Sequence, residues 1–274
     1  ENYLLIGTDA TGNNKNGADY QGSMADFLML VIVDKTENTY SFLQFNRDTM
    51  TEVALIDHNG EGEATANIQL CTAHWYGGNR EQSCENTVKS VKKLLGGIQI
   101  DGYYELNMSE IPKLNSMVDG VTVTLEDDFS KKYPKMKKGA TINLDDEQAY
   151  AYVHDRYGVG DEENTSRMKR QQQYMTGFFK KLQEKVKANP NYANEVFESL
   201  QDVSTTDIAI GKISNISNIF ASGTDKGIFE LAGKSKIGQA LGDEMDHMEF
   251  YVNKKAMVST MSELFGIVEQ KNKE

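Results

Sequence analysis

The chain has 274 residues, a formal net charge of -12, 39% hydrophobic and 26% charged residues, and only three prolines. This composition excludes a disordered or low-complexity scaffold. The acidity argues against nucleic-acid binding, which normally needs a basic patch to displace counterions. We therefore expect one globular domain over residues 1–274, in which any bound phosphate is held by a local group of cations.

The sequence contains no apolar run of the roughly 18 residues that a membrane helix needs, and no signal peptide is visible. It begins at Glu1 without an initiator methionine and enters the apolar segment Tyr3 to Ile6 almost at once. We therefore expect the sequence to be part of a longer protein.

Three apolar segments in the first third of the chain have the length and composition of strands: Tyr3 to Ile6, Phe27 to Val33 and Tyr40 to Phe45, with a turn at Glu37-Asn38. The nearly continuous apolar run from Phe27 to Val33 is typical of a strand that is covered on both faces. The pattern predicts an α/β fold, namely a single α-β-α sandwich-like domain whose central mixed sheet is covered by helices.

Helices and further strands are expected along the rest of the chain. In chain order they are a helix after Ser83 that stops at Gly96-Gly97, strands near Tyr103 to Leu106 and Val121 to Leu125, a helix opened by Leu144 to Glu147, and a long helix from about Arg167 to Ala188 that ends at Asn189-Pro190. Beyond Thr205, helical and strand-like stretches alternate without a linker.

Cys71 and Cys84 are the only cysteines, too few for a disulfide scaffold and without the paired spacing of a zinc site. From the residues alone, a bridge and two unpaired thiols are about equally compatible with the sequence. Because disulfides persist where the environment is oxidising, we expect a Cys71–Cys84 bridge if the protein lies outside the cytoplasm.

The first group of candidate site residues consists of two carboxylates at strand ends. Asp9 follows the strand Tyr3 to Ile6, and Asp26 begins the next strand. Two such carboxylates can converge on Mg²⁺, which typically takes one or two carboxylates together with phosphate oxygens. The alternative is that each caps a loop or turn, and the pair by itself favours that alternative.

The second candidate is Arg47, in the charged step Asn46 to Thr49 that follows an apolar strand. Its planar guanidinium can bind a phosphate through two parallel hydrogen bonds. The alternative is a structural ion pair with Asp48 or another carboxylate.

The third group surrounds the expected start of the long helix. Helical spacing places Arg167 on one face with Arg170 and Gln171, and the backbone N–H groups of a helix N-terminus attract anions. A solvated helix face is the alternative. The members of this group are His154, Asp155, Arg156, Asp161, Arg167, Lys169, Arg170 and Gln171.

Motifs of covalent catalysis, nucleotide loops and zinc-hydrolase helices are not found in the sequence. The four histidines, His58, His74, His154 and His247, lack the spacing of metal ligands. The candidate chemistry is therefore that of phosphate and metal binding.

Taken in order, these blocks resemble the LytR-CpsA-Psr family, a group of membrane-anchored proteins of the Gram-positive cell envelope. The resemblance covers nearly the whole chain, and its specificity lies in the order of the blocks. These are Leu4 to Asp9; Ala25-Asp26 leading into Met29 to Val31; Asn46 to Thr49; Trp75 to Gly78; Leu144 to Arg156; and then Asp161, Arg167 and Arg170-Gln171.

The resemblance implies a transferase that moves a glycopolymer from a polyprenyl-pyrophosphate carrier to a peptidoglycan hydroxyl, assisted by Mg²⁺ or a similar divalent cation. The implied partners are the polyprenyl (pyro)phosphate lipid, the glycopolymer, the peptidoglycan acceptor, and the membrane through a helix that precedes residue 1. The implied location is extracytoplasmic, anchored to the cell membrane and facing the wall. Nucleic acid is not an expected partner.

The resemblance also implies residue roles. It places the metal at Asp9 and Asp26, and we take Arg47, Arg156 and Asp161 as the catalytic residues. Such a site is physically coherent, because phosphoryl transfer depends on charge neutralisation and alignment more than on covalent help. The expected substrate-binding residues are Arg47, Arg156, Arg167, Arg170 and Gln171.

Three positions depart from the family pattern by losing a cation. Met24 and Ala66 stand where the family usually has Arg and Lys, and His154 replaces the first Arg of an Arg-x-Arg pair that ends at Arg156. Losing one preorganised charge contact can cost on the order of a hundredfold in rate. A catalytically weakened polyprenyl-phosphate-binding or regulatory module is therefore the alternative function, and a structural surface domain is a third.

Overall fold

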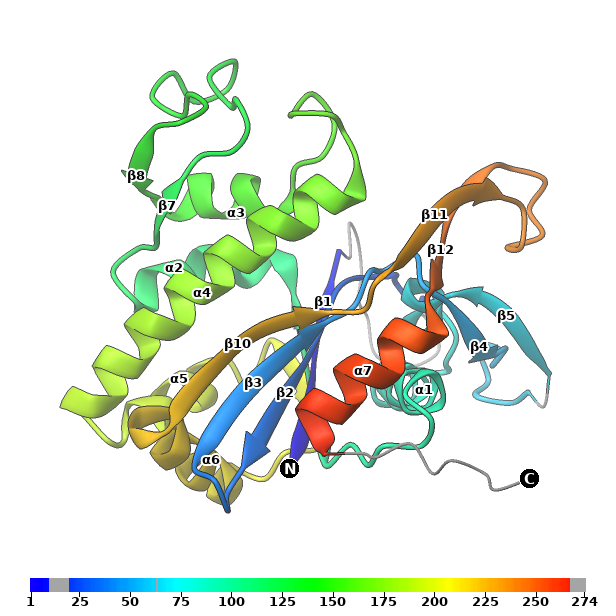
Figure 1. The fold of residues 1–274 in the computed structure, drawn as a ribbon, viewed down its shortest axis with the longest axis horizontal. Helices are drawn as coiled ribbons and strands as arrows, with labels where there is room; N and C mark the ends of the chain where they lie inside the picture. Colours follow the sequence, from blue (N-terminus) through cyan, green and yellow to red (C-terminus); the bar gives the residue numbers. More distant parts are fainter. Residues whose placement is uncertain (10–19, 63, 267–274) are drawn as a thin grey trace. The chain divides into compact units, whose positions relative to one another are not determined.

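The computed structural model describes residues 1–9, 20–62 and 64–266. The chain forms two compact units: unit 1 is Glu1–Leu106, Thr205–Ile208 and Asp225–Glu274, and unit 2 is Asn107–Ser204 and Ala209–Thr224. The expected mixed α/β fold with a central sheet is confirmed (Figure 1). The expectation of a single domain over residues 1–274 stays a prediction.

Unit 1 is built around a six-stranded sheet, counted over the described residues, in the order β10-β3-β2-β1-β6-β9. The first three strands pair antiparallel. Each lies within two residues of its predicted bounds, because long apolar runs are the strongest strand signal in the sequence. The strands are β1 (Asn2–Thr8), β2 (Ala25–Asp34), β3 (Thr39–Gln44), β6 (Gly102–Asn107), β9 (Ser204–Thr206) and β10 (Thr224–Glu230).

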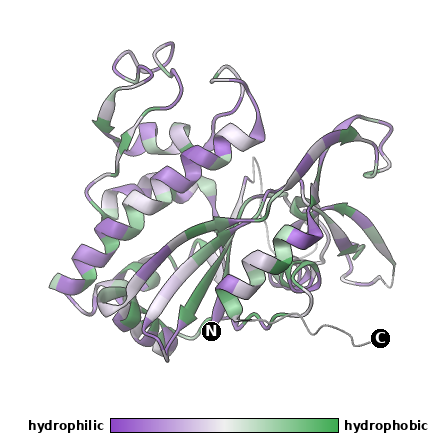
Figure 2. Ribbon diagram, in the orientation of Figure 1, coloured by the Kyte–Doolittle hydropathy of each residue, from purple (hydrophilic) through white to green (hydrophobic). Residues whose placement is uncertain are grey.

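Two helices, α1 (Arg80–Leu94) and α7 (Lys254–Phe265), lie on the same side of this sheet (Figure 1). Val91 of α1 and Met261 of α7 belong to one buried cluster with Leu28 and other strand residues. Hydrophobic and hydrophilic residues alternate along α7 (Figure 2), as expected for a helix with one face on a core. Burial of this apolar surface is the main stabilising contribution to unit 1.

Helix α1 begins one turn earlier than the periodicity predicts. The side chain of Asn79 accepts a hydrogen bond from the backbone N–H of Gln82 and so caps the helix. The buried positions of the first turn include Ser83 and Cys84, which do not stand out in an apolar pattern. The predicted stop is confirmed, since Gly96 and Gly97 both have positive φ.

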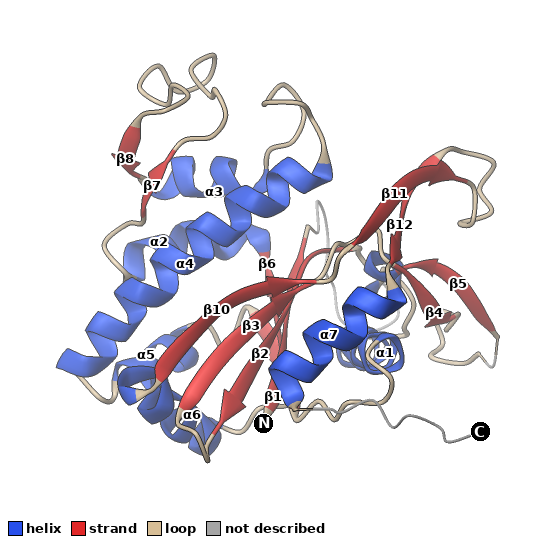
Figure 3. Cartoon of the chain, viewed as in Figure 1, coloured by secondary structure: helices blue, strands red, loops and turns tan. Residues whose placement is uncertain are grey.

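Two further hairpins in unit 1 were not predicted from the sequence, because their strands are only five or six residues long and mix polar with apolar residues. They are drawn as separate two-stranded ribbons in Figure 3. These elements are β4 (Met50–Ala54) paired with β5 (Thr65–Gln69), and β11 (Gly233–Gly238) paired with β12 (His247–Val252), with the short 3-10 helix η1 (Leu70–His74) after β5.

Unit 2 is mainly helical, and its core contains Val121, Tyr152, Tyr174 and Phe178. Among the described helices, none combines the length and the apolarity needed to cross a membrane. The elements are η2 (Met108–Glu110), α2 (Ile111–Met117), β7 (Thr122–Thr124), β8 (Thr141–Asn143), α3 (Asp146–His154), α4 (Asn164–Ala188), α5 (Tyr192–Ser199) and α6 (Ile210–Ser222).

The predicted bridge between Cys71 and Cys84 is wrong: both residues are free, buried cysteines. Each thiol contacts a different basic side chain. The sulfur of Cys71 accepts a hydrogen bond from Arg47 over 3.3 Å, and the sulfur of Cys84 lies 3.6 Å from Nε2 of His74. Burial raises the pKa of both thiols, which keeps them protonated and unreactive.

Candidate functional site

Asp9 and Asp26 lie at the same end of the antiparallel pair β1–β2. The strands pair Gly7 with Phe27 and then Thr8 with Ala25, so Asp26 is the extra residue of a β-bulge. Asp9 follows Thr8 directly. A bulge bends the strand and redirects the side chain at the irregularity. The register therefore brings the two predicted metal residues to neighbouring positions at one edge of unit 1.

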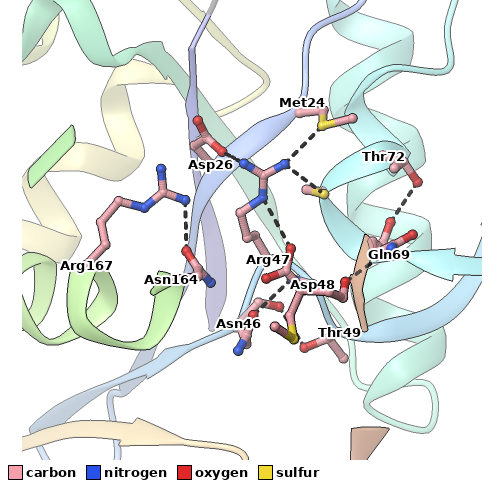
Figure 4. A network of polar contacts seen from close by, with 12 residues as sticks. Met24, Asp26, Asn46, Arg47, Asp48, Thr49, Gln69, Thr72, Asn164 and Arg167 are labelled. Atoms are coloured by element: carbon pink, nitrogen blue, oxygen red, sulfur yellow. Dashed lines mark hydrogen bonds and ion pairs between the residues drawn. The ribbon is translucent and has the colours of Figure 1, made fainter. Parts of the chain in front are cut away.

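The guanidinium of Arg47 forms an ion pair with the carboxylate of Asp26 (Figure 4). The side chains of Arg47 and Asp26 are only 17% and 9% exposed. Asp48 also contributes a carboxylate oxygen, 3.6 Å from Nε of Arg47. Of the two alternatives open from the sequence, a phosphate contact and a structural ion pair, the structure shows the ion pair.

Met24 and Cys71 contact the same guanidinium through their sulfur atoms. The Sδ atom of Met24 lies 2.9 Å from Nη2 of Arg47, and the Sγ atom of Cys71 lies 3.3 Å from the same nitrogen. Burial by itself lowers the pKa of Arg47, but Cys71, Asp26 and Asp48 raise it by more. Arg47 is therefore a permanent positive charge at this edge of unit 1.

The carboxylates of Asp9 and Asp26 fit a hard divalent cation whose remaining ligands come from elsewhere. Within residues 1–9, 20–62 and 64–266 there is no group of three or more His, Cys, Asp or Glu side chains that could hold a metal by itself. Two carboxylates on neighbouring strand ends, however, match the one or two that Mg²⁺ usually takes when phosphate oxygens and water supply the rest. Asp9 and Asp26 are therefore the residues that would hold it.

His74, at the end of η1, is buried beside this region and is neutral. Its Nδ1 lies 3.0 Å from the carbonyl oxygen of Ser23, and the Cys84 thiol lies near Nε2. Burial is the largest effect on the pKa of His74 and lowers it, and the positive charge of Arg80 lowers it further. Glu105 and the Ser23 carbonyl raise this pKa, but by less than burial lowers it. Both ring nitrogens are thus used by a neutral imidazole.

We expect this histidine to make unit 1 less stable in acid. Because its pKa is lower in the folded than in the unfolded state, only the unfolded chain takes up the proton, and stability falls as the pH drops below about 6.5. Urea unfolding of the wild type and His74→Gln between pH 7 and 5 should show a steeper loss for the wild type. His58→Gln, which changes an exposed histidine, should retain the wild-type slope, and equal slopes in all three proteins would contradict the expectation.

In unit 2, Arg170 and Gln171 bind the end of helix α3. Arg170 is 1% exposed and donates hydrogen bonds to the carbonyl oxygens of Tyr152, over 2.9 Å, and of Asp155. The Gln171 amide donates to the carbonyl of Val153 over 3.2 Å. The last carbonyls of a helix have no partner within the helix. These two side chains satisfy them, and so fix the chain that leads into Arg156.

Arg170 also makes a charged contact that holds a loop. Its Nη1 donates to Asp127 over 2.5 Å, and its guanidinium lies 5.4 Å from the ring centre of Phe129. All of these contacts are with the protein itself. The structure therefore gives Arg170 a structural role, and the substrate contact expected of it stays a prediction.

Helix α4 begins at Asn164, three residues before the predicted start. Asp161 organises this start: its carboxylate accepts hydrogen bonds from the backbone N–H of Glu163 over 3.0 Å and from the Ser166 hydroxyl over 2.8 Å. These bonds lower the pKa of Asp161, which is an exposed residue. A carboxylate held in its ionised form is a weak base, and the two hydrogen bonds give Asp161 a role in ordering the turn that leads into α4.

Arg167 therefore lies in the second turn of α4 and not at its first residue. It is 4% exposed, and its Nη2 donates to the side-chain oxygen of Asn164 over 2.8 Å (Figure 4). The helix thus presents a second buried guanidinium, next to Arg170 in the same element.

Arg156 and His154 differ in their surroundings. Arg156 donates to the hydroxyl of Tyr157 and lies 4.6 Å from the centre of its ring. Tyr157 is 75% exposed. The ring of His154 stacks on Tyr150 at 4.7 Å, and its Nδ1 lies 3.2 Å from Asp155. The predicted residues thus form two groups, one in each unit.

The sequence reasoning missed one charged pair, Arg80 and Glu105. The carboxylate of Glu105 is completely buried in β6, and Arg80 forms an ion pair with it over 2.5 Å. A signal was present in the sequence. In a strand, residues two apart share a face, so the inward-facing Tyr103 placed Glu105 inside as well.

The chain belongs to the LytR_cpsA_psr family, whose model matches residues 1–265, and the resemblance seen in the sequence is confirmed. The solved structures that it resembles include gbs0355 from Streptococcus agalactiae, with 20% identity and a TM-score of 0.76 over 100% of this chain and 90% of that one. TagV from B. subtilis has 19% identity and a TM-score of 0.72 over 97% of both chains.

A structure of TagT bound to LI-WTA also matches, with 20% identity and a TM-score of 0.70 over 97% of this chain and 89% of that one. At these identities the likeness shows the fold. No curated protein matches this chain.

Proposed function

We propose that the protein is a cell-envelope transferase that moves a glycopolymer from a polyprenyl-pyrophosphate carrier to a hydroxyl of peptidoglycan, with Mg²⁺. Membership of the family and the likeness to TagT, which has been solved with LI-WTA, support this proposal. The observation that carries it is the buried pair of Asp26 and Arg47, at the strand ends where Asp9 also lies.

In the proposed reaction, Asp9 and Asp26 hold the cation and Arg47 binds a phosphate. A buried guanidinium that already pairs with a carboxylate can exchange it for a phosphate of similar geometry. Asp26 would then be free to hold the cation together with Asp9. The chemistry that bound Mg²⁺ supplies is neutralisation of charge on the phosphate oxygens.

The reaction forms one bond and breaks one. The acceptor hydroxyl oxygen bonds to the phosphorus that carries the glycopolymer, and the bond from that phosphorus to the bridging oxygen of the pyrophosphate breaks. Polyprenyl monophosphate leaves with the bridging oxygen, and the hydroxyl proton passes to water. Little covalent help from the protein is needed, because the transition state of phosphoryl transfer is loose.

We assign Arg156, Arg167 and Gln171 of unit 2 to binding of the anionic substrate, as the family pattern implies. Arg170 supports them indirectly by fixing the chain that leads into Arg156. Asp161 contributes by ordering the turn that leads into α4, where Arg167 lies. A location outside the cytoplasm, at the membrane and facing the wall, follows from the substrates proposed and is part of the proposal.

The second candidate function is a module that binds polyprenyl phosphate without turning it over. Three observations favour it. Met24 offers Arg47 a thioether in place of a further cation; Ala66 lies in β5 opposite Val53; and the His154 ring is stacked on Tyr150. The structure thus shows no guanidinium or ammonium group at any of these three positions.

A turnover assay beside a thermal-shift titration separates the two functions. We expect the wild type, given a lipid-linked glycopolymer and peptidoglycan fragments, to form product with Mg²⁺ and none with a chelator. Arg156→Ala and Arg167→Ala should abolish turnover, and Lys180→Ala, an exposed position on α4, should not. Stabilisation by polyprenyl phosphate without product would establish the binder, and full turnover in both arginine variants would refute the transferase site.

A further inference from the structure

A hydrogen-bonded series in unit 1 connects helix α1 to the end of strand β1. The hydroxyl of Thr8 donates to Oε1 of Glu105 over 2.7 Å, and Nη2 of Arg80 lies 2.5 Å from Oε2 of the same carboxylate. Thr8 and Glu105 are completely buried. The series therefore uses both carboxylate oxygens and joins three elements, α1, β6 and β1.

Such an arrangement is unusual for a purely structural contact. A buried carboxylate is costly unless it is paired and hydrogen-bonded. An apolar residue at position 105 would fill the same space without that requirement. Because Glu105 is completely buried, it cannot touch a substrate either, which excludes a catalytic role for its carboxylate.

Thr8, the last member of the series, lies beside the predicted metal residues. Thr8 is the residue at which the β1–β2 register shifts around Asp26, and Asp9 is the next residue along the chain. A bulge leaves the local backbone with a less regular ladder. A charge-assisted hydrogen bond to the Thr8 side chain fixes this backbone from inside the protein.

We propose that Arg80, Glu105 and Thr8 form a positioning series that fixes the end of β1, so that Asp9 is placed to bind a divalent cation; this rests on the proposed function. None of the three residues is a ligand. They act through the backbone of Thr8, as outer hydrogen bonds do at metal sites, where their loss typically weakens metal binding about 10- to 100-fold.

The test uses the Thr8 hydroxyl, because it can be removed with little change of shape. Binding of Mn²⁺ to the whole chain, without substrate, is followed by the electron paramagnetic resonance signal of the free ion. Thr8→Val should bind Mn²⁺ about tenfold or more weakly. Thr8→Ser, which keeps the hydroxyl, should lie within about twofold of the wild type.

A matched control removes a buried hydroxyl elsewhere in unit 1. The Thr87 hydroxyl donates to the Ser83 carbonyl over 2.8 Å within α1, so Thr87→Val should leave Mn²⁺ binding unchanged. If Thr8→Val does not fold, Glu105→Gln replaces it as the test variant. Glu105→Gln should weaken Mn²⁺ binding by the same factor.

The proposal is overturned if Thr8→Val or its replacement binds Mn²⁺ as the wild type does, or if Thr8→Ser is weakened as much as Thr8→Val. It is also overturned if the wild type binds no Mn²⁺ without substrate, or if Asp9→Asn leaves wild-type binding intact. If instead the wild type binds Mn²⁺ through Asp9 but forms no transfer product, the proposed function fails and the positioning series stands.

Discussion

Replacing Arg47 with alanine should lower the rate of glycopolymer transfer by about 10²- to 10³-fold. Arg47 is the buried guanidinium that pairs with Asp26, and in the proposed reaction it binds a phosphate of the substrate. Removing a preorganised donor from a site where charge develops removes transition-state stabilisation directly. The measurement is product formation under saturating Mg²⁺, with circular dichroism to verify that the variant is folded.

Two further variants make the Arg47 result specific. Arg47→Lys keeps the charge but loses the planar pair of donors, so it should recover only a small part of the rate. Lys93→Ala removes an exposed cation that pairs with Glu52 in the same unit over 3.3 Å, and it should be as active as the wild type. A folded Arg47→Ala protein with a rate within about threefold of the wild type would contradict the phosphate-binding role.

Replacing Arg170 with alanine should destabilise the protein by about 3 to 5 kcal/mol, because the change leaves Asp127 and two backbone carbonyls without their donor. The side chain of Arg170 is 1% exposed, whereas that of Asp127 is 15% exposed. Water can therefore replace part of the lost contact, which favours the lower end of this range. Urea unfolding followed by circular dichroism measures the change.

The neighbouring Lys169 provides the control for Arg170. It is exposed on the same helix, and Lys169→Ala should change stability by no more than about 0.5 kcal/mol. A loss below about 1 kcal/mol in Arg170→Ala would show that the buried contacts contribute little.

The parts of the fold that were predicted correctly are those with long, regular patterns. Strands β1 to β3 are apolar runs, and α4 is a helix of 25 residues with apolar side chains at helical spacing. Local sequence and tertiary structure therefore agree in these elements. The β4–β5 and β11–β12 hairpins were missed because their strands are only five or six residues long and mix polar with apolar residues. Such strands are specified by their partners and have little pattern of their own.

The candidate site was predictable in part, for reasons that differ between its residues. Asp9 and Asp26 follow from the rule that side chains at adjoining strand ends lie close together, and the register places them so. The use of Arg170 and Gln171 for the carbonyls of α3 could not be predicted, because the spacing of residues in one helix says nothing about the helix packed beside it.

The Arg80–Glu105 pair could be predicted only in part, for a related reason. Alternation along β6 indicates that Glu105 faces inward, but only the fold brings Arg80 of α1 to it. The expected disulfide failed similarly. The presence of two cysteines made a bridge conceivable, but the packing of Cys71 on Arg47 and of Cys84 on His74 gives each thiol its own neighbour.

Asp26 is an additional residue in β2, and it interrupts the regular pairing with β1. A chain that lacked Asp26 would continue its ladder from Phe27 to Ala25 without interruption, but Arg47 would lose its carboxylate partner. A buried charge without a partner is strongly destabilising. The irregular strand is therefore also the arrangement that gives this guanidinium its counter-charge.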